Sequence, residues 1–302
     1  MHITVAICTW NRASLLAQTL TAMTALRVPE RTTWELLVVD NNSTDDTAAT
    51  IAAFAGRLPI RRVFEPTPGL SSARNLATIE ASGEYLLWTD DDVLVEPGWL
   101  EAYVAAFVRR PAAGFFGGVI RPWFPNDPPE WLRRGFDHVA TAYAALDHGP
   151  EEVPLSHGRF PFGANMAFRI NEQRAFSYNP SFGRRPGNTP GGGGEETDVF
   201  RRMEARGIEG WWVPGAVVRH YIPLQRQSIA YVRRYFMGYG EYLAQTEDQS
   251  SAPRLFGKPR WMWRSVLANE ARYRVGRVFA SPEQWVPHLK LASVAWGQFL
   301  HS

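Results

Sequence analysis

The segment EYLLWTDDDV, residues 84–93, joins a short apolar run to three consecutive carboxylates. The run YLLW has the composition of a buried β-strand. Asp90, Asp91 and Asp92 follow at once, although adjacent like charges repel each other. Two explanations are open: water solvates the three acids in a loop, or a bound cation compensates their charge. The rest of the chain favours the second explanation.

Strand-like and helix-like segments alternate through the first part of the chain. The predicted strands are residues 3–8, 34–40, 60–65 and 85–90, and the predicted helices are residues 14–26, 41–56, 71–83 and 97–110. Ser14 is a candidate N-cap of the first helix, and Gly83 is expected to end the third. Such alternation implies right-handed crossovers and a Rossmann-like, mainly parallel sheet flanked by helices, which is an α/β fold.

Polar residues follow several of the predicted strands. Thr9 and Asn11 come after the first strand, Asp40 and Asn42 after the second, and the three aspartates after the fourth. Ligands of parallel sheets gather at the carboxyl ends of the strands, so we expect these side chains to converge. An Asp-x-Asp turn can give carboxylates to a hard divalent cation and leave its other positions to phosphate oxygens. The pattern therefore predicts a site for a metal and a nucleoside diphosphate.

Composition sets limits on the class of protein. The chain has 302 residues, 45% of them hydrophobic and 21% charged, which is typical of a folded protein. Cys8 is the single cysteine, so the chain forms no internal disulfide and no cysteine metal cluster. Its first residues do not resemble a secretory signal, and no apolar run is long enough to span a bilayer. We expect a cytoplasmic protein that contacts the inner face of the membrane peripherally.

Positive charge is concentrated near the C-terminus. From Arg219 onward there are 12 Lys+Arg and 5 Asp+Glu, a balance of +7, whereas the remainder has 20 and 25, a balance of −5. The tryptophans among these arginines are Trp261, Trp263, Trp285 and Trp296. They are either packed in a helical core beneath a solvated surface, or available to a bilayer or to nucleic-acid bases. We expect a helical extension at 246–302 that contacts membrane and not nucleic acid.

Four segments carry a resemblance to a known family. VAICTWNR (5–12), LLVVDNNSTDDT (36–47), PGLSSARNLA (68–77) and YLLWTDDDVLVEPGWL (85–100) resemble, in order and spacing, the signatures of family 2 glycosyltransferases. The resemblance implies a GT-A fold over residues 1–245. It divides this domain into a nucleotide-sugar-binding half, 1–120, and an acceptor half, 121–245.

The same resemblance implies an activity. Enzymes of this family transfer a sugar from a nucleotide-diphosphate sugar, usually linked to UDP, to an acceptor hydroxyl with inversion at the anomeric carbon. The expected setting is the synthesis of polysaccharides, cell-envelope glycans or glycoconjugates. The alternative is a nucleotide-sugar-binding protein that has no transferase activity.

The donor site can be assigned by the resemblance. The implied nucleotide-sugar-binding residues are Thr9, Asn11, Arg12, Asp40, Asn42, Arg74, Asp90 and Asp91. Asp40 is expected to bond the base and Arg74 to lie near the nucleotide. Asp92 and His220 are implied as ligands of Mn²⁺ or Mg²⁺. The alternatives remain an N-cap role for Asp40, a surface position for Arg74 and ordinary packing for His220.

The acceptor site is expected in the second half. FPFGANMAFRI (160–170) resembles an acceptor-side strand, in which Gly163 permits close approach and Asn165 binds hydroxyls. The helix start GGGGEETD (191–198), which follows a flexible loop, resembles a motif that carries the general base. It maps to Glu196, with Glu195 as the rival, and Asp198 is implied in acceptor binding or helix capping. The four glycines predict a hinge that orders over the donor.

Overall fold

A computed structural model describes residues 1–183, 194–246 and 253–302. The described chain forms two compact units. The first contains residues 1–123, 144–183 and 194–221, and the second contains residues 124–143, 222–246 and 253–302. The predicted domain boundary after residue 245 differs from this division, because the chain enters the second unit twice.

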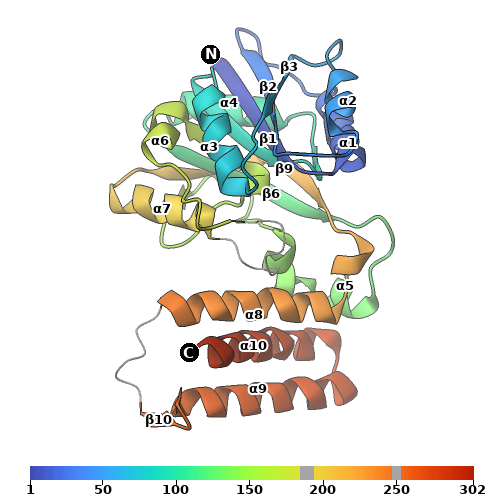
Figure 1. The fold of residues 1–302 in the computed structure, drawn as a ribbon, viewed down its shortest axis with the longest axis vertical. Helices are drawn as coiled ribbons and strands as arrows, with labels where there is room; N and C mark the ends of the chain where they lie inside the picture. Colours follow the sequence, from blue (N-terminus) through green and yellow to red (C-terminus); the bar gives the residue numbers. More distant parts are fainter. Residues whose placement is uncertain (184–193, 247–252) are drawn as a thin grey trace. The chain divides into compact units, whose positions relative to one another are not determined.

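The first unit is built on a nine-stranded sheet with the order β3-β2-β1-β4-β8-β6-β9-β5, in which β7 also pairs with β9 (Figure 1). Its strands are β1 (His2–Thr9), β2 (Thr33–Asp40), β3 (Ile60–Phe64), β4 (Tyr85–Asp90), β5 (Val93–Val95), β6 (Phe115–Trp123), β7 (Pro154–Leu155), β8 (Met166–Arg169) and β9 (Gly210–Tyr221). The first four strands are parallel, β6 and β9 follow their direction, and β5, β7 and β8 run opposite. The predicted α/β class and its mainly parallel sheet are confirmed.

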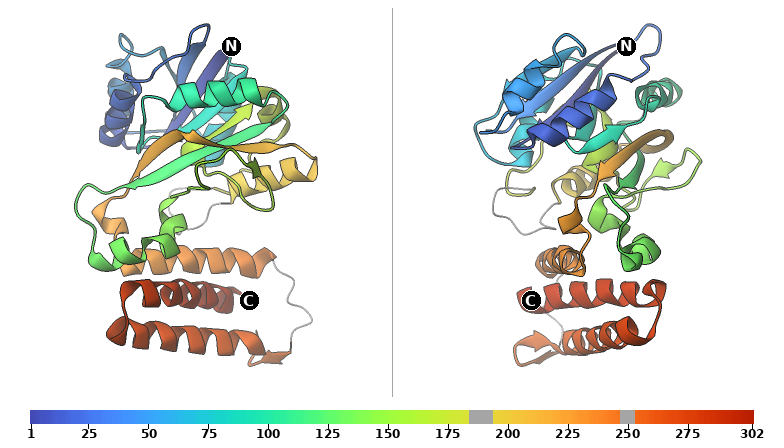
Figure 2. Two further views of the ribbon diagram at one scale, coloured as in Figure 1. Left: turned by 180° about the vertical axis from the view of Figure 1, so that it is seen from behind. Right: turned by 90° about the vertical axis from the view of Figure 1, so that its right-hand side faces the viewer.

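Helices cover both faces of this sheet because its strands are apolar on both sides (Figure 2). They are α1 (Ala13–Met23), α2 (Thr47–Ala52), α3 (Leu70–Glu80), α4 (Trp99–Arg109), α6 (Ile170–Ala175) and α7 (Glu195–Ala205), with the 3₁₀ helix η2 (Gly163–Asn165) before β8. Along β1, Val5 packs into a core with residues of α1 and α4, whereas Ala6 packs into a second core with residues of α3 and α7. Successive side chains of one strand therefore contribute to two cores, one on each face of the sheet.

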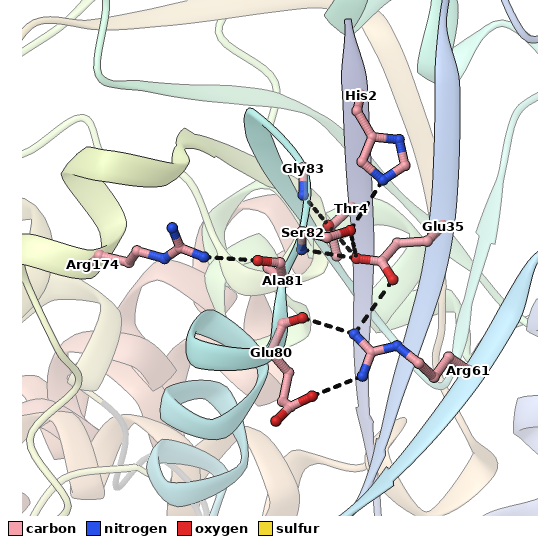
Figure 3. Close-up of polar contacts among 9 residues, drawn as sticks. All are labelled: His2, Thr4, Glu35, Arg61, Glu80, Ala81, Ser82, Gly83 and Arg174. Carbon is pink, nitrogen blue, oxygen red and sulfur yellow. Dashed lines mark hydrogen bonds and ion pairs between the residues drawn. The ribbon is translucent and has the colours of Figure 1, made fainter.

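The starts of the parallel strands are joined by a polar network, which Figure 3 shows in close-up. Glu35 accepts hydrogen bonds from the hydroxyl of Thr4 (2.7 Å) and from the backbone and hydroxyl of Ser82 (3.0 and 2.7 Å). Arg61 lies 3.4 Å from Glu35 and also binds the carboxylate of Glu80. Burial raises the pKa of Glu35, but the Ser82 and Thr4 bonds and Arg61 outweigh it, so the net shift is downward. The network therefore holds the strand starts with an ionised carboxylate.

Two local predictions about helix ends are wrong. Ser14 does not cap α1, because Arg12 occupies the N-cap position and the Ala13 N–H instead donates to the carboxylate of Asp45 (3.0 Å). Gly83 lies beyond the end of α3 at Glu80, in a turn where a Cβ would collide with the backbone of β1. At both positions the backbone is fixed by residues distant in sequence, Asp45 for the start of α1 and β1 for Gly83, and not by the local capping signal.

The second unit is helical, as predicted for the C-terminal extension. It contains α5 (Glu130–Val139), α8 (Ile229–Thr246), α9 (Arg260–Phe279) and α10 (Pro282–His301), the 3₁₀ helices η1 (Ala140–Tyr143) and η3 (Leu224–Arg226), and a small hairpin of β10 (Arg254–Leu255) and β11 (Lys258–Pro259). Within this unit α10 lies between α8 and α9 (Figure 1). The backbones of α8 and α10 meet closely at Gly240 and Gly297, where an added Cβ would strike the opposite helix.

A separate core supports this second unit. Leu132 of α5 packs with Val232 of α8, Tyr273 of α9 and Val286 of α10. Trp285 is buried in the same cluster, so this tryptophan is a core residue, whereas Trp261 is exposed. Among the described residues, none of the helices is both long enough and apolar enough to cross a membrane.

Candidate active site

The three aspartates lie at the carboxyl edge of the parallel strands, between β4 and β5. Asp90 is the last residue of β4 and stands beside Cys8 of β1. The next strand, β5, pairs with β9 so that Val93 lies opposite His220. This pairing brings His220 to the aspartates across more than a hundred residues of sequence. Ligand atoms of Asp90, Asp92 and His220 all lie within 4.8 Å of one another.

This cluster has the chemistry of a site for a hard divalent cation. Two carboxylates and one imidazole offer oxygen and nitrogen ligands, and the Nε2 of His220 lies 3.4 Å from Oδ1 of Asp92. Burial, together with the neighbouring charge of Asp92, raises the pKa of Asp90. A divalent cation would remove this unfavourable concentration of negative charge, so the residues fit a metal.

Asp91 is not one of the three residues of that cluster and has protein partners. It accepts hydrogen bonds from the Thr9 hydroxyl (2.7 Å) and from Nη1 of Arg12 (2.8 Å). The same Nη1 donates to Asp92 (2.8 Å), so Arg12 joins two of the three acids. Burial raises the pKa of Asp91 to about 6 despite these bonds. Thr9, Arg12 and Asp91 therefore fix the turn, and their contact with a nucleotide sugar stays a prediction.

A second cluster of predicted residues surrounds the buried side chain of Arg74 on α3. Its Nη1 donates to Glu195 (3.1 Å), and its Nη2 lies 2.6 Å from Glu196, both at the start of α7. A Cβ at Gly163 would collide with Arg74 and Glu196. The glycine is therefore needed for this pair of side chains to meet. The structure brings these four predicted residues together, although Arg74 faces glutamates and its contact with a nucleotide stays a prediction.

The two glutamates differ in their surroundings. Burial raises the pKa of Glu196, and Arg74 and a hydrogen bond from the Gly163 N–H only partly offset it. Glu195 is buried more deeply, and its Oε2 has no hydrogen-bond partner within the described part of the chain. A carboxylate that is partly exposed and has a raised pKa suits proton transfer better than one enclosed in the protein.

Two aromatic residues near Arg74 had no motif to identify them. The guanidinium lies 5.8 Å from the ring centroid of Trp88 and 5.4 Å from that of Tyr178. Asn75 holds the Tyr178 backbone with two hydrogen bonds of 2.8 Å. Asn75, which follows Arg74 in the motif PGLSSARNLA, was the only sequence signal for the position of Tyr178. Its amide can hold a loop that is distant in sequence.

The predicted base-binding residue Asp40 is buried at the end of β2. Its Oδ1 accepts from the Ser43 N–H (3.0 Å), and its Oδ2 accepts from Nε and Nη2 of Arg62 (3.0 and 2.6 Å). The N-cap alternative for Asp40 is wrong, because α2 (Thr47–Ala52) has Asp46 at its N-cap position and the bond from Ser43 closes the preceding loop. Arg62 was missed, although the alternation along the third predicted strand places it beside the end of the second.

Asn11 and Asn42 shape the loops at the same edge. Both have positive φ values, 51° and 63°, which asparagine tolerates better than most residues. The side chain of Asn11 accepts from the Thr44 N–H (2.7 Å). The segment 41–46 is consequently a loop held by side chains, and the helix predicted from residue 41 begins only at Thr47.

Two predicted acceptor residues have other partners. Asn165 is fully buried: its Oδ1 accepts from the Trp99 indole and the Tyr103 hydroxyl, and its Nδ2 donates to two backbone carbonyls. Its amide is fully used, which does not support the prediction that it binds acceptor hydroxyls. Asp198 lies on the first turn of α7 and pairs with Arg202 at 2.9 Å. Of the predicted hinge, 191–193 lies outside the described residues, as does the loop before it.

Comparison with known proteins identifies the family. The sequence profile described as Glycosyl transferase family 2 matches residues 4–176, more than half of the chain. The chain belongs to glycosyl transferase family 2. This match covers β1 to β4, the aspartates and the η2–β8 segment, and it confirms the resemblance seen in the sequence. The chain is accordingly a glycosyltransferase.

Among proteins of similar sequence is the succinoglycan biosynthesis protein ExoM of Rhizobium meliloti. The two are 28% identical over 273 residues, which cover 89% of this chain and 81% of ExoM. Validoxylamine A glucosyltransferase of Streptomyces hygroscopicus is 27% identical over 231 residues, covering 68% of this chain and 52% of the relative. The chain thus matches most of one relative and about half of the other.

Solved structures show the same fold at lower identity. A mannosyltransferase of Pyrobaculum calidifontis in complex with GDP-Man and Mn²⁺ matches with a TM-score of 0.65 at 19% identity, over 98% of this chain and 86% of that one. The TarS 1–349 structure of S. aureus with UDP-GlcNAc matches with a TM-score of 0.54 at 15% identity, over 99% and 90% of the two chains. These similarities confirm the GT-A fold.

Proposed function

We propose that this glycosyltransferase is metal-dependent and inverting, and that it moves a sugar from a UDP-sugar to the hydroxyl of a saccharide acceptor. The observation that carries the proposal is the cluster of Asp90, Asp92 and His220 at the carboxyl edge of the sheet. The relatives' names support the setting, since one acts in succinoglycan biosynthesis and another is a glucosyltransferase. We therefore propose a role in polysaccharide or cell-envelope glycan synthesis.

Asp92 and His220 would hold Mn²⁺ or Mg²⁺, with Asp90 directed to the ion or to the ribose and sugar of the donor. When bound, such an ion offsets the charge of the diphosphate leaving group. Arg12 keeps Asp92 in place through its bond to Oδ2, while Oδ1 faces His220. The protein thereby presents the carboxylate in a fixed orientation.

Glu196 would act as the general base. It takes the proton of the acceptor hydroxyl while the acceptor oxygen bonds to the anomeric carbon, and the bond from that carbon to the diphosphate oxygen breaks. Attack from the opposite face inverts the anomeric centre. The bond from the Gly163 N–H and the contact with Arg74 hold the Glu196 carboxylate for this transfer.

A uracil base suits the partners of Asp40. Uracil has one imide N–H flanked by two carbonyl oxygens, so it requires one acceptor with donors beside it. Asp40 supplies the acceptor, and the Arg62 guanidinium on the same carboxylate supplies a neighbouring donor. Guanine would present two N–H donors, whereas Arg62 already bonds Oδ2 twice and Ser43 bonds Oδ1, so this carboxylate can accept one more donor. This arrangement supports UDP over GDP.

The test measures nucleotide binding by calorimetry. UDP and GDP are titrated into the protein with Mn²⁺, with Mg²⁺ and with EDTA, and the variants Asp92→Asn and Asp137→Asn are compared. We expect metal-dependent binding of UDP that Asp92→Asn abolishes. Asp137→Asn, on the exposed side of α5, is expected to bind UDP as the wild type does.

A second measurement follows release of UDP from UDP-glucose, UDP-galactose and UDP-N-acetylglucosamine with Mn²⁺. If Asp92→Asn binds UDP and turns over donor like the wild type, the metal assignment is wrong. Tighter metal-dependent binding of GDP than of UDP would refute the choice of nucleotide.

A further inference from the structure

Helix α9 of the second unit has an outward face of unusual composition. Its inward residues Met262, Val266 and Tyr273 are buried, as expected for a helix packed on a core. The opposite side should then be polar. Instead it exposes four large apolar side chains: Leu267 (66%), Val275 (59%), Val278 (72%) and Phe279 (84%). Exposed apolar residues gathered on one helix face indicate an interaction surface.

The charges on that side are of one sign. All five arginines of α9 are exposed: Arg260, Arg264, Arg272, Arg274 and Arg277. Arg277 lies toward the inward side, where its Nη1 donates to the Tyr273 hydroxyl (3.5 Å), and the other four lie further round the helix. The one acid of the helix, Glu270, is mostly buried and pairs with Arg233 and Arg274. The outward face of α9 therefore combines aliphatic side chains with guanidinium groups and carries no exposed carboxylate.

The β10–β11 hairpin extends this surface beyond the start of α9. Phe256 at its tip is 85% exposed, and Leu255 beside it is also exposed. The hairpin is fixed to α9, because the Trp263 indole donates to the Leu255 carbonyl (2.9 Å) and the rings of Phe256 and Trp263 meet edge to face at 6.2 Å. An apolar tip held in this way is a built feature of the second unit.

We propose that the outward face of α9 and the tip of the β10–β11 hairpin, hereafter the α9 face, bind the surface of a bilayer that contains anionic lipid. Aliphatic and aromatic side chains can enter the boundary between head groups and acyl chains, while the long stems of arginine let the guanidinium groups reach lipid phosphates. This inference names a surface and its partner, and it does not depend on the proposed donor or metal.

Two other occupants fit the α9 face less well. A second copy related by a two-fold axis would set arginines against arginines, with no exposed acid on this helix to compensate. A single-stranded nucleic acid would use a series of stacked aromatic rings between cations, whereas the α9 face has two exposed phenylalanines at its opposite ends and aliphatic Leu267, Val275 and Val278 between them. A bilayer with anionic lipid can bind the apolar side chains and the arginines at the same time.

The test is co-sedimentation of the whole protein with vesicles. One set contains phosphatidylcholine alone, and the other contains phosphatidylcholine with phosphatidylglycerol. We expect binding to the second set, weakening as salt is raised. Arg264→Gln and Arg272→Gln should each lower the partition coefficient roughly fivefold. Val278→Glu should lower it by about tenfold or more, since it removes an apolar contact and adds a repelled charge.

Matched controls lie in the first unit. Val108→Glu changes a similarly exposed apolar residue on α4, and Arg57→Gln removes an exposed arginine. Both should bind vesicles like the wild type, and every variant should keep the wild-type melting temperature because the changed side chains are exposed.

Three results would overturn the proposal. The first is equal binding to both sets of vesicles, or to neither. The second is full vesicle binding by Val278→Glu. The third is a dimer in light scattering that Val278→Glu dissociates, which would assign the α9 face to a second copy.

Discussion

Glu195 and Glu196 share one arginine but occupy different surroundings. Glu195 is enclosed and anchors Nη1 of Arg74, while Glu196 is more exposed and has a raised pKa. The motif in the sequence left the choice of base open, since two glutamates stand where one acid is usual. The contacts favour Glu196 as the base and Glu195 as the residue that holds Arg74.

Replacing the base should separate chemistry from binding. Glu196→Gln keeps the size of the side chain but cannot accept the proton, so turnover should fall by roughly 10²–10⁴-fold while the affinity for UDP stays near the wild-type value. Single-turnover kinetics and UDP calorimetry measure the two effects. Glu195→Gln is the comparison; if it loses more turnover than Glu196→Gln with its fold intact, the roles are reversed.

Gly163 offers a second test of the same pair. In Gly163→Ala the new methyl group would meet the ends of the Arg74 and Glu196 side chains, which are flexible and can move aside. We expect a folded protein whose turnover falls about 10²-fold, because a displacement near 1 Å at a reacting group has that effect. Gly56→Ala, where a methyl group meets nothing within 4 Å, should leave turnover unchanged. Equal rates for the two variants would argue against a positioning role for Gly163.

At the scale of elements, the network around Glu35 connects four segments at the strand starts. The lowered pKa of Glu35 means that the folded state favours the ionised form of this carboxylate. The stabilisation is therefore complete above the ordinary value of 4.5 and is lost as the pH falls through the lowered value.

Glu35→Gln should lower the free energy of unfolding at pH 7 by about 1–2 kcal/mol, because it replaces the ionised acceptor of the Thr4, Ser82 and Arg61 hydrogen bonds with a neutral amide. It should also flatten the loss of stability below pH 4.5, the pKa that this acid ordinarily has. Urea unfolding at several pH values measures both effects. Glu30→Gln, at an exposed position, serves as the control. If the stability of Glu35→Gln depends on pH as that of the wild type does, Glu35 does not have this role.

The elements that could be predicted were those with strong local signals. Residues of β1, β2 and β4 form apolar runs that end in polar residues, β3 has β-branched and aromatic residues around two arginines, and each matches a predicted strand within two residues. By contrast, β6 contains Gly117 and Gly118, and β5 has only three residues, so neither has a clear pattern. These strands exist because they pair with β9, which no local property of their sequences reveals.

The residues of the candidate site likewise divide into those with a local sequence signal and those placed by remote contacts. Asp90 to Asp92 could be found from the sequence because they stand together after a strand. His220 was implied only by the family resemblance, since the β5–β9 pairing that places it is remote in sequence. Asn165 looked available for an acceptor, yet burial beside Trp99 and Tyr103 uses its amide. Burial of a polar side chain is a property of the assembled core.

For the molecule as a whole, the two units have separate cores, so damage to one should leave the other functional. Gly297→Ala would force α8 and α10 apart, and overpacking of this kind typically costs about 1–3 kcal/mol. We expect faster hydrogen exchange in 229–246 and 282–301 with unchanged UDP affinity. Leu291→Ala, at an exposed site on α10, should change neither. Loss of UDP binding in Gly297→Ala would show that the units depend on each other.

The second unit draws α5 and η1 from the middle of the chain and its other helices from the end. Gly135 of α5 meets Val286 of α10, and Leu132 shares its core. A premature stop codon after residue 245 would leave α5 translated but deprived of α10, with part of its apolar side in water. Shortened genes would then encode an aggregation-prone protein, and a swap of this unit between relatives would have to exchange two stretches of DNA.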